Sequence, residues 1–161
     1  MEDIATTRTA SLYNDDIENV NEILSDNICN KIIVVIGGAG SIGKSTIKAL
    51  LKYKPSIVHV IDSSENNLAE LARDLNNSLL ISQVTQVYYH PLNCSDSIFL
   101  SFFKSLKLPD LILNFSALKH VRSEKNVWSV WQMFNINLLS QYKLINLLSK
   151  LQFKGSYFAV S

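Results

Sequence analysis

The chain of 161 residues is poor in the residues that mark several specialised protein classes. Its two cysteines, Cys29 and Cys94, cannot build a disulfide framework and form no Cys-x-x-Cys pair, so we expect a reducing, cytoplasmic setting. No apolar run approaches the ~20 residues that a membrane-spanning helix needs. The first thirty residues also lack the apolar stretch of a signal peptide. We therefore expect a soluble protein with no membrane partner.

The chain also lacks an excess of either charge. Fifteen Lys and Arg residues against fourteen Asp and Glu residues give a formal net charge of +1, so nothing in the charge balance indicates a nucleic-acid partner. The three histidines, His59, His90 and His120, are scattered and have no cysteine or carboxylate partners at metal-ligand spacing, so we expect no metal site. A hydrophobic content of 47% is that of an ordinary folded domain.

Apolar β-branched segments alternate with amphipathic segments along residues 31–161. We expect strands at 32–36, 57–61, 85–89, 111–115 and 157–160, and helices at about 41–53, 64–77, 97–106 and 127–151. This alternation predicts an α/β fold with a Rossmann-type, doubly wound parallel sheet and right-handed crossovers. Residues 1–30 are more polar and predict a separate segment with one short amphipathic helix, or a loose tail.

The last predicted helix carries an aromatic stripe that includes Trp128, Trp131 and Phe134. Spacing of this kind is typical of a helix face that packs on a sheet, so we predict packing. Pairing of two copies into a homo-oligomer through this helix is the alternative.

A glycine-rich loop follows the first predicted strand. Gly37, Gly40 and Gly43 are spaced as in a dinucleotide-binding turn, where they permit a tight turn, close approach of a pyrophosphate and close helix packing. Residues 38–45 also fit the P-loop pattern G-x-x-x-x-G-K-[ST]. In that case Lys44 would reach the phosphates of a nucleotide and Ser45 would hold Mg²⁺. The motif alone allows both interpretations.

Asp62 favours the dinucleotide interpretation. It ends the second strand nineteen residues after Gly43, where a dinucleotide fold places the carboxylate that binds the ribose hydroxyls of adenosine. A carboxylate would repel a 2′-phosphate, and the following residues, Ser63 and Ser64, bring no arginine to offset this. We therefore predict NAD as the cofactor rather than NADP.

Four segments carry a family resemblance: the glycine loop at 37–43, Ser-Glu-Asn-Asn-Leu at 64–68, Pro-Asp at 109–110 and Ala-Leu-Lys-His-Val at 117–121. Together they resemble the CapD-like polysaccharide biosynthesis proteins. These are extended short-chain dehydrogenase/reductase relatives that include UDP-N-acetylglucosamine 4,6-dehydratases, which are lyases, and nucleotide-sugar epimerases. The resemblance covers residues 31–161. It implies an NAD(P)-binding domain of a nucleotide-sugar dehydratase or epimerase with a UDP-sugar substrate.

The resemblance also implies site residues. Those at the pyrophosphate are Gly37, Gly40, Ser41, Ile42 and Gly43; those at the adenosine ribose are Asp62 and Ser63; those beside the adenine are Asn93 and Cys94; and those along the nicotinamide ribose and the mouth of the sugar site are Ser116, Ala117 and Lys119. Asn93 would accept a hydrogen bond from the adenine amino group through its amide oxygen. Asn137 matches an asparagine that supports the catalytic centre. In these relatives NAD(P)⁺ takes a hydride from the sugar C4, water leaves across C5–C6, and the hydride returns to C6.

The family's later catalytic residues have no counterpart. The relatives continue with Thr-Asp-Lys, and later with a Tyr or Met and a Lys, where this chain stops at Ser161. We therefore expect no catalytic residue, a sheet incomplete at its C-terminal side, and a domain fragment of an enzyme; a non-catalytic dinucleotide-binding module is the alternative. Residues 93–94 replace an Asp-Val pair of the family, and residues 114–116 replace a His-Ala-Ala run.

Overall fold

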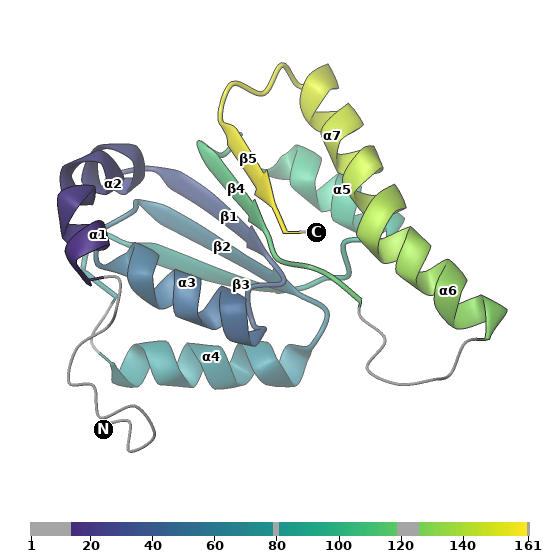
Figure 1. Ribbon diagram of the computed structural model, residues 1–161, viewed down its shortest axis with the longest axis horizontal. Coiled ribbons are helices and arrows are strands. Elements are labelled where there is room, and N and C mark those ends of the chain that lie inside the picture. Colours follow the sequence, from purple (N-terminus) through teal and green to yellow (C-terminus); the bar gives the residue numbers. More distant parts are fainter. Residues whose placement is uncertain (1–13, 79–80, 119–125, 161) are drawn as a thin grey trace.

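The computed structural model describes residues 14–78, 81–118 and 126–160. Its centre is a five-stranded sheet in the order β3-β2-β1-β4-β5, with all neighbouring strands parallel (Figure 1). The strands are β1 (Ile32–Ile36), β2 (Ile57–Asp62), β3 (Gln86–Pro91), β4 (Leu111–Asn114) and β5 (Ser156–Ala159). This order is that of a Rossmann fold, and the predicted fold class is confirmed.

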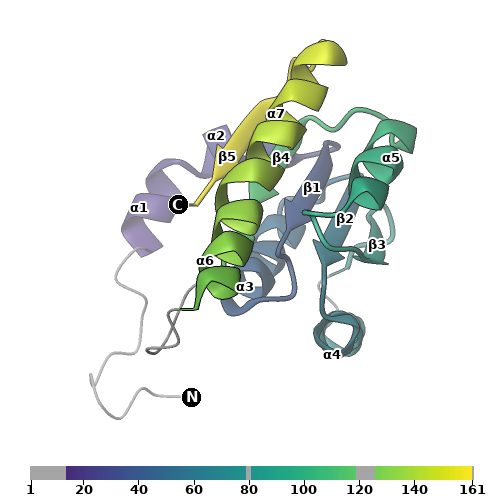
Figure 2. The same ribbon diagram turned by 90° about the vertical axis from the view of Figure 1, so that its right-hand side faces the viewer.

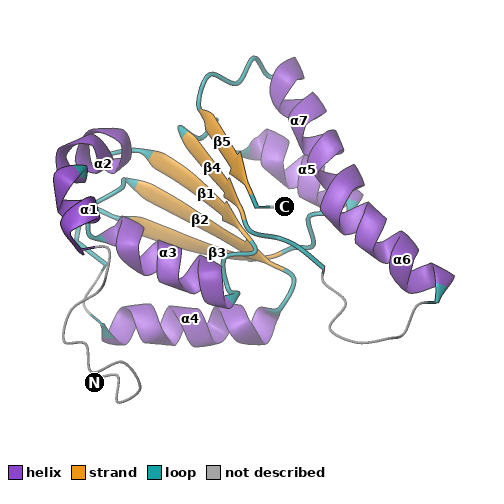
Figure 3. Cartoon of the chain, in the orientation of Figure 1, coloured by secondary structure: helices purple, strands orange, loops and turns teal. Residues whose placement is uncertain are grey.

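Helices cover both faces of the sheet, as Figure 3 shows by colour. The helices are α1 (Asn14–Asn19), α2 (Asn21–Ile28), α3 (Ser41–Leu51), α4 (Glu65–Asn77), α5 (Ser97–Ser105), α6 (Val127–Phe134), the π-helix η1 (Asn135–Leu139) and α7 (Ser140–Lys150). Helices α3 and α4 lie on one face, and α5 and α7 lie on the other (Figure 2). None of the described helices is long and apolar enough to cross a membrane.

The core consists of two apolar layers that share strand β1. All five residues of β1 are buried because helices cover both of its faces. Ile33 and Val35 pack toward α3 and α4, whereas Val34 and Ile36 pack toward α5 and α7. A fully buried side chain of this size stabilises the fold by about 1.5–3 kcal/mol.

Within its described residues, 14–30, the N-terminal segment forms two helices where the sequence predicted one. Helix α2 packs Leu24 and Ile28 against the layer that also contains α3 and α4. Asn30, with a φ of 61°, then turns the chain into β1. This part of the chain therefore adds to the core of the α/β domain.

The prediction that the aromatic stripe of the last helix packs on the sheet is wrong. Trp128 and Trp131 are 78% and 60% exposed, and no described residue of α6 is buried. From Val127 to Lys150 the helix is about 36 Å long, whereas strands of four residues span about 13 Å. Only the α7 half lies over the sheet, and it buries Leu144, Leu147 and Leu148. Pairing of two copies through this helix stays a prediction.

Candidate functional site

A cleft of about 260 Å³ opens at the carboxyl ends of the strands. After β1 the chain builds β2 and β3 on one side, and it then crosses over to build β4 on the other side. Ligands of open α/β sheets bind at such a switch point, because the loops that leave the two neighbouring strands diverge there.

The cleft brings together eight of the twelve residues that the sequence singled out for cofactor binding. They are Gly37, Gly40, Asp62, Ser63, Asn93, Cys94, Ser116 and Ala117. Ser41, Ile42 and Gly43 form the first turn of α3 and lie outside the cleft lining. Lys119 lies outside the described residues. These placements agree with the predicted arrangement, and the binding roles themselves stay predictions.

Sequence reasoning missed the apolar residues of the lining. They are Ile36, Ile61, Leu92, Phe115, Leu118 and Ile136. The signal that could have found four of them is their position, because Ile36, Ile61, Leu92 and Phe115 each lie within one residue of the end of a strand. Such side chains provide flat apolar walls, and small-molecule sites are mostly built this way.

Two glycines of the loop are required by the fold itself. Gly37 has a φ of +72°, and a Cβ there would lie 2.7 Å from the backbone nitrogen of Ser116. A Cβ at Gly43 would lie 2.5 Å from the carbonyl oxygen of Gly37. These contacts leave no room for a side chain, so both positions hold the loop close to α3 and to the end of β4.

Gly40 differs from the other two. The nearest described atom to a Cβ there would be the Gly37 carbonyl oxygen at 3.4 Å, an ordinary van der Waals contact. Gly40 is also exposed and is the N-cap of α3, where it offers no side chain to bind the first N–H groups of the helix. The space above Gly40 and the helix N-terminus therefore suit an anionic group of a ligand.

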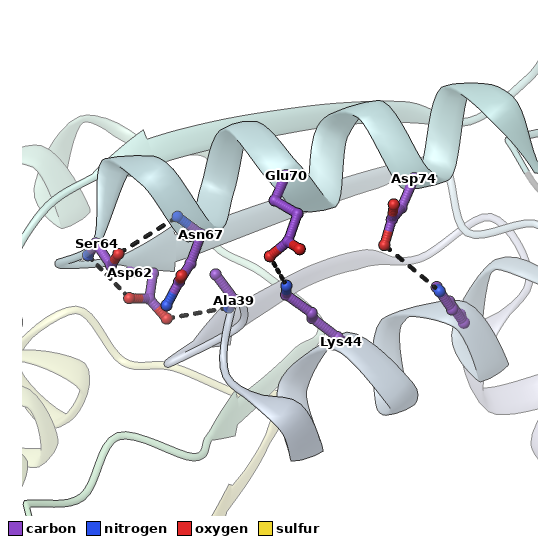
Figure 4. A network of polar contacts seen from close by, with 8 residues as sticks. Ala39, Lys44, Asp62, Ser64, Asn67, Glu70 and Asp74 are labelled. Atoms are coloured by element: carbon purple, nitrogen blue, oxygen red, sulfur yellow. Dashed lines mark hydrogen bonds and ion pairs between the residues drawn. The ribbon is translucent and has the colours of Figure 1, made fainter.

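Asp62 ties the glycine loop to helix α4 (Figure 4). Its Oδ2 accepts a hydrogen bond from the Ala39 N–H at 3.0 Å, and its Oδ1 accepts one from the Ser64 N–H at 3.0 Å. Ser64 in turn caps α4 by accepting from the Asn67 N–H at 3.3 Å. An ionised carboxylate has about four acceptor positions, so Asp62 keeps acceptor capacity for ligand hydroxyls in the cleft.

Lys44 points toward α4 (Figure 4). Its Nζ lies 2.6 Å from Oε2 of Glu70, and this hydrogen bond lowers the pKa of the Glu70 carboxyl. Ser45 donates its hydroxyl to the carbonyl oxygen of Ser41, one turn earlier in the same helix. A P-loop needs both side chains at the phosphates. The arrangement of Lys44 and Ser45 therefore argues against the P-loop alternative.

Asn93 follows β3 and forms part of the wall opposite the glycine loop. Its Oδ1 accepts hydrogen bonds from the Ser95 N–H at 3.0 Å and from the Ser95 hydroxyl at 2.9 Å. Both lone pairs of the amide oxygen are thereby used, so the amide N–H₂ is the group left for a ligand. This geometry disfavours the expectation that Asn93 accepts a hydrogen bond from an adenine amino group, and the binding role of Asn93 stays a prediction.

The π-helix η1 positions Asn137 against the loop that follows β4. Asn137 accepts a hydrogen bond from the Leu118 N–H at 2.8 Å and donates one to the Leu118 carbonyl at 2.9 Å. The Asn137 side chain therefore satisfies both backbone groups of Leu118, as a neighbouring strand would. Single π-helical turns often occur at functional sites, and this one directs an amide toward the rim of the cleft.

His59 and His90 lie side by side on β2 and β3, with 3.0 Å between His59 Nδ1 and His90 Nε2. Burial, together with the neighbouring His90, lowers the pKa of His59 to about 4. Burial also lowers the pKa of His90. The described residues contain no group of three or more His, Cys, Asp or Glu side chains that could hold a metal ion.

Residues 33–155 match the family model described as "Polysaccharide biosynthesis protein". The chain belongs to this family. A curated relative, an uncharacterized membrane protein of Methanocaldococcus jannaschii, is 34% identical over 92 residues, which are 57% of this chain and 25% of that protein. The family that the four sequence segments resembled is therefore confirmed.

Solved structures share the fold. Pen from Bacillus thuringiensis has a TM-score of 0.68 and 22% identity, over 83% of this chain and 39% of that chain. The Bordetella bronchiseptica enzyme WbmF in complex with NAD⁺ and UDP has a TM-score of 0.57 and 23% identity, over 81% of this chain and 34% of that one. The chain thus spans only part of these proteins, and at such identities the likeness concerns the fold alone.

Proposed function

We propose that the chain is the NAD-binding domain of a nucleotide-sugar dehydratase or epimerase that acts in polysaccharide biosynthesis. The observation that carries this proposal is the position of the Asp62 carboxylate, which lies at the end of β2, beside the glycine loop and in the cleft lining. In dinucleotide-binding folds, a carboxylate in this place accepts a hydrogen bond from the 2′-hydroxyl of the adenosine ribose.

From one end of the cleft to the other, its residues suit the successive chemical groups of such a cofactor. The first turn of α3 would bind the pyrophosphate over Gly40 through backbone N–H groups. Asp62 and Ser63 would hold the adenosine ribose. Leu92 and Cys94 would form an apolar wall for the adenine, and the free N–H₂ of Asn93 would donate to a ring nitrogen.

The other half of the cofactor would lie beyond β1, against the loop that follows β4. Phe115 and Ile136 would exclude water from this end of the cleft, and Ser116 and Ala117 would lie along the second ribose. When bound, the nicotinamide supplies a reversible acceptor for a sugar hydride.

A UDP-sugar is the substrate class that we propose for the whole enzyme. Support comes from the family membership and from the resemblance of the segment 117–121 to the mouth of the sugar site in nucleotide-sugar enzymes. WbmF, which shares the fold, was crystallised with NAD⁺ and UDP together.

We also propose that the protein works in the cytoplasm. Cys29 and Cys94 are free thiols, which suits a reducing compartment.

Calorimetric titration of the chain with NAD⁺, NADP⁺ and Mg-ATP tests the cofactor assignment. We expect binding of NAD⁺, weaker binding of NADP⁺ because the Asp62 carboxylate repels a 2′-phosphate, and no binding of Mg-ATP. The variant Lys44→Met is the matched control, because it should leave NAD⁺ affinity unchanged. If the loop were a P-loop, the same change would abolish ATP binding. Tight Mg-ATP binding that depends on Lys44, without a response to NAD⁺, would overturn the proposal.

A further inference from the structure

A chain of polar side chains lies beneath the floor of the cleft at the end of β4. Its centre is Asn114, which is 2% exposed and ends that strand. Asn114 Nδ2 lies 3.1 Å from the hydroxyl of Tyr157, on the neighbouring strand β5. Its Oδ1 lies 3.0 Å from the backbone nitrogen of Ser116 and 2.6 Å from the Ser116 hydroxyl oxygen.

These contacts determine where the protons of the network lie. The backbone N–H of Ser116 can only donate, so the atom of Asn114 that faces it must be the carbonyl oxygen. An amide oxygen cannot donate, so the Ser116 hydroxyl, 2.6 Å from the same oxygen, must direct its single proton to Asn114. On the other side of the amide, Nδ2 therefore donates to the Tyr157 hydroxyl.

Cys94 forms a hydrogen bond with the hydroxyl oxygen of the same serine. Its thiol donates to the Ser116 hydroxyl oxygen at 3.4 Å, and Ser140 lies farther from the sulfur, at 3.9 Å. A serine hydroxyl has one proton and two lone pairs. Ser116 donates its proton to Asn114 Oδ1, and one of its lone pairs accepts the Cys94 S–H, so one lone pair is left.

Ser116 lines the cleft, and it lies across β1 from Asp62. Its backbone nitrogen adjoins Gly37 at the centre of the switch point. A ligand that is held at Asp62 by one sugar and crosses the glycine loop would therefore bring its other sugar to Ser116.

We propose that Ser116 offers the cleft a hydrogen-bond acceptor and no donor, that it thereby selects a hydroxyl of the distal ribose of a dinucleotide, and that Asn114 and Tyr157 are the positioning residues that hold it in this state. This inference rests on the proposed function, because it assumes that the adenosine end lies at Asp62. To the proposed function the inference adds one side-chain contact, from Ser116, which depends on the hydrogen bonds between Ser116, Asn114 and Tyr157. A ligand with a carbonyl oxygen at the same place would meet a lone pair and be disfavoured.

Three ligands locate the contact: NAD⁺ and ADP-ribose, which both carry the distal ribose, and ADP, which lacks it. In calorimetric titrations, Ser116→Ala should weaken NAD⁺ and ADP-ribose about three- to tenfold, the effect of one hydrogen bond, and leave ADP unchanged. Ser63→Ala, at the adenosine end, is the control and should weaken all three ligands. An equal loss for ADP in Ser116→Ala, or no loss for any ligand, would overturn the assignment.

Tyr157→Phe tests the positioning role. Without the phenol oxygen, Asn114 Nδ2 loses its acceptor and the amide is free to turn, so ADP-ribose affinity should fall while ADP affinity stays constant. In a Ser116→Ala background the same change should have no further effect on ADP-ribose, because the group that Tyr157 positions is gone. A purely structural role would instead lower the affinity of all three ligands in both backgrounds. Wild-type protein that binds none of the ligands would refute the proposed function, and this inference with it.

Discussion

The carboxylate of Asp62 accepts a hydrogen bond from the backbone N–H of Ala39, 23 positions earlier in the chain, at 3.0 Å. The residue that the cofactor would need for its ribose therefore also holds the loop that the cofactor would need for its phosphates. The second oxygen binds the Ser64 N–H, so a single side chain joins the glycine loop, the end of β2 and the start of α4. Binding and local stability should respond together when this residue is changed.

Replacing Asp62 tests that coupling. In Asp62→Asn one carboxylate oxygen becomes an N–H₂ group, which faces a backbone N–H and loses a charged hydrogen bond. We expect the free energy of unfolding, measured by urea denaturation, to fall by about 1–2 kcal/mol. Asp96→Asn is the control, because Asp96 precedes α5 without a side-chain cap bond and should change little. Asp62→Ala should weaken NAD⁺ more than NADP⁺; equal losses for the two cofactors would contradict the ribose role.

Substitutions at Gly43 and Gly40 should affect stability and cofactor binding separately. Gly43→Ala places a Cβ 2.5 Å from the Gly37 carbonyl oxygen and should lower the thermal unfolding midpoint strongly. Gly40→Ala has room in the protein and should leave that midpoint within a few degrees. The same methyl group fills space that we assign to the pyrophosphate, so NAD⁺ affinity should fall at least about tenfold. Unchanged affinity in Gly40→Ala would remove the pyrophosphate from this position.

Asn137 should stabilise the loop after β4. Asn137→Ala removes two hydrogen bonds to Leu118, and we expect faster hydrogen exchange at the Leu118 amide, equivalent to about 1–2 kcal/mol of lost protection. Asn146→Ala is the matched control, since Asn146 is exposed on the following helix α7. If both variants give the same exchange rate at Leu118, the two hydrogen bonds from Asn137 do not stabilise this loop.

The imidazole pair makes the fold sensitive to acid. The folded-state pKa of His59 is lowered from 6.5 to about 4 by burial and by His90, so between these values the unfolded chain binds more protons than the folded one. Stability should therefore be constant above pH 6.5 and fall as the pH decreases from 6.5 toward 4, by up to about 3 kcal/mol.

Urea midpoints at pH 7 and pH 5 measure this effect. His59→Gln should reduce the difference between the two midpoints, because the variant has no group that titrates at this position. His90→Gln should reduce it as well, since it removes both a titrating group and the repulsion that His59 feels. A difference as large in His59→Gln as in the wild type would refute this account.

The prediction from the sequence succeeded where local pattern is enough. Continuous β-branched segments such as 32–36 become buried strands of a parallel sheet whatever their neighbours are. Asp62 sits where a strand ends, so its place at the edge of the sheet followed from chain order alone. The pattern failed for Trp128 and Trp131, because helical spacing defines a face but does not say whether a sheet is long enough to cover it.

By itself, the sequence determined the order of strands and helices, the family and the set of polar residues that gather at the carboxyl ends of the strands. Periodicity and turn chemistry act over a few residues, so a linear pattern contains them. Only the tertiary structure decided that Lys44 binds Glu70, that Asn93 has used its amide oxygen, and that the proton of Ser116 points to Asn114. A side chain with several donors or acceptors takes its partners by distance and direction, and these exist only after the chain has folded.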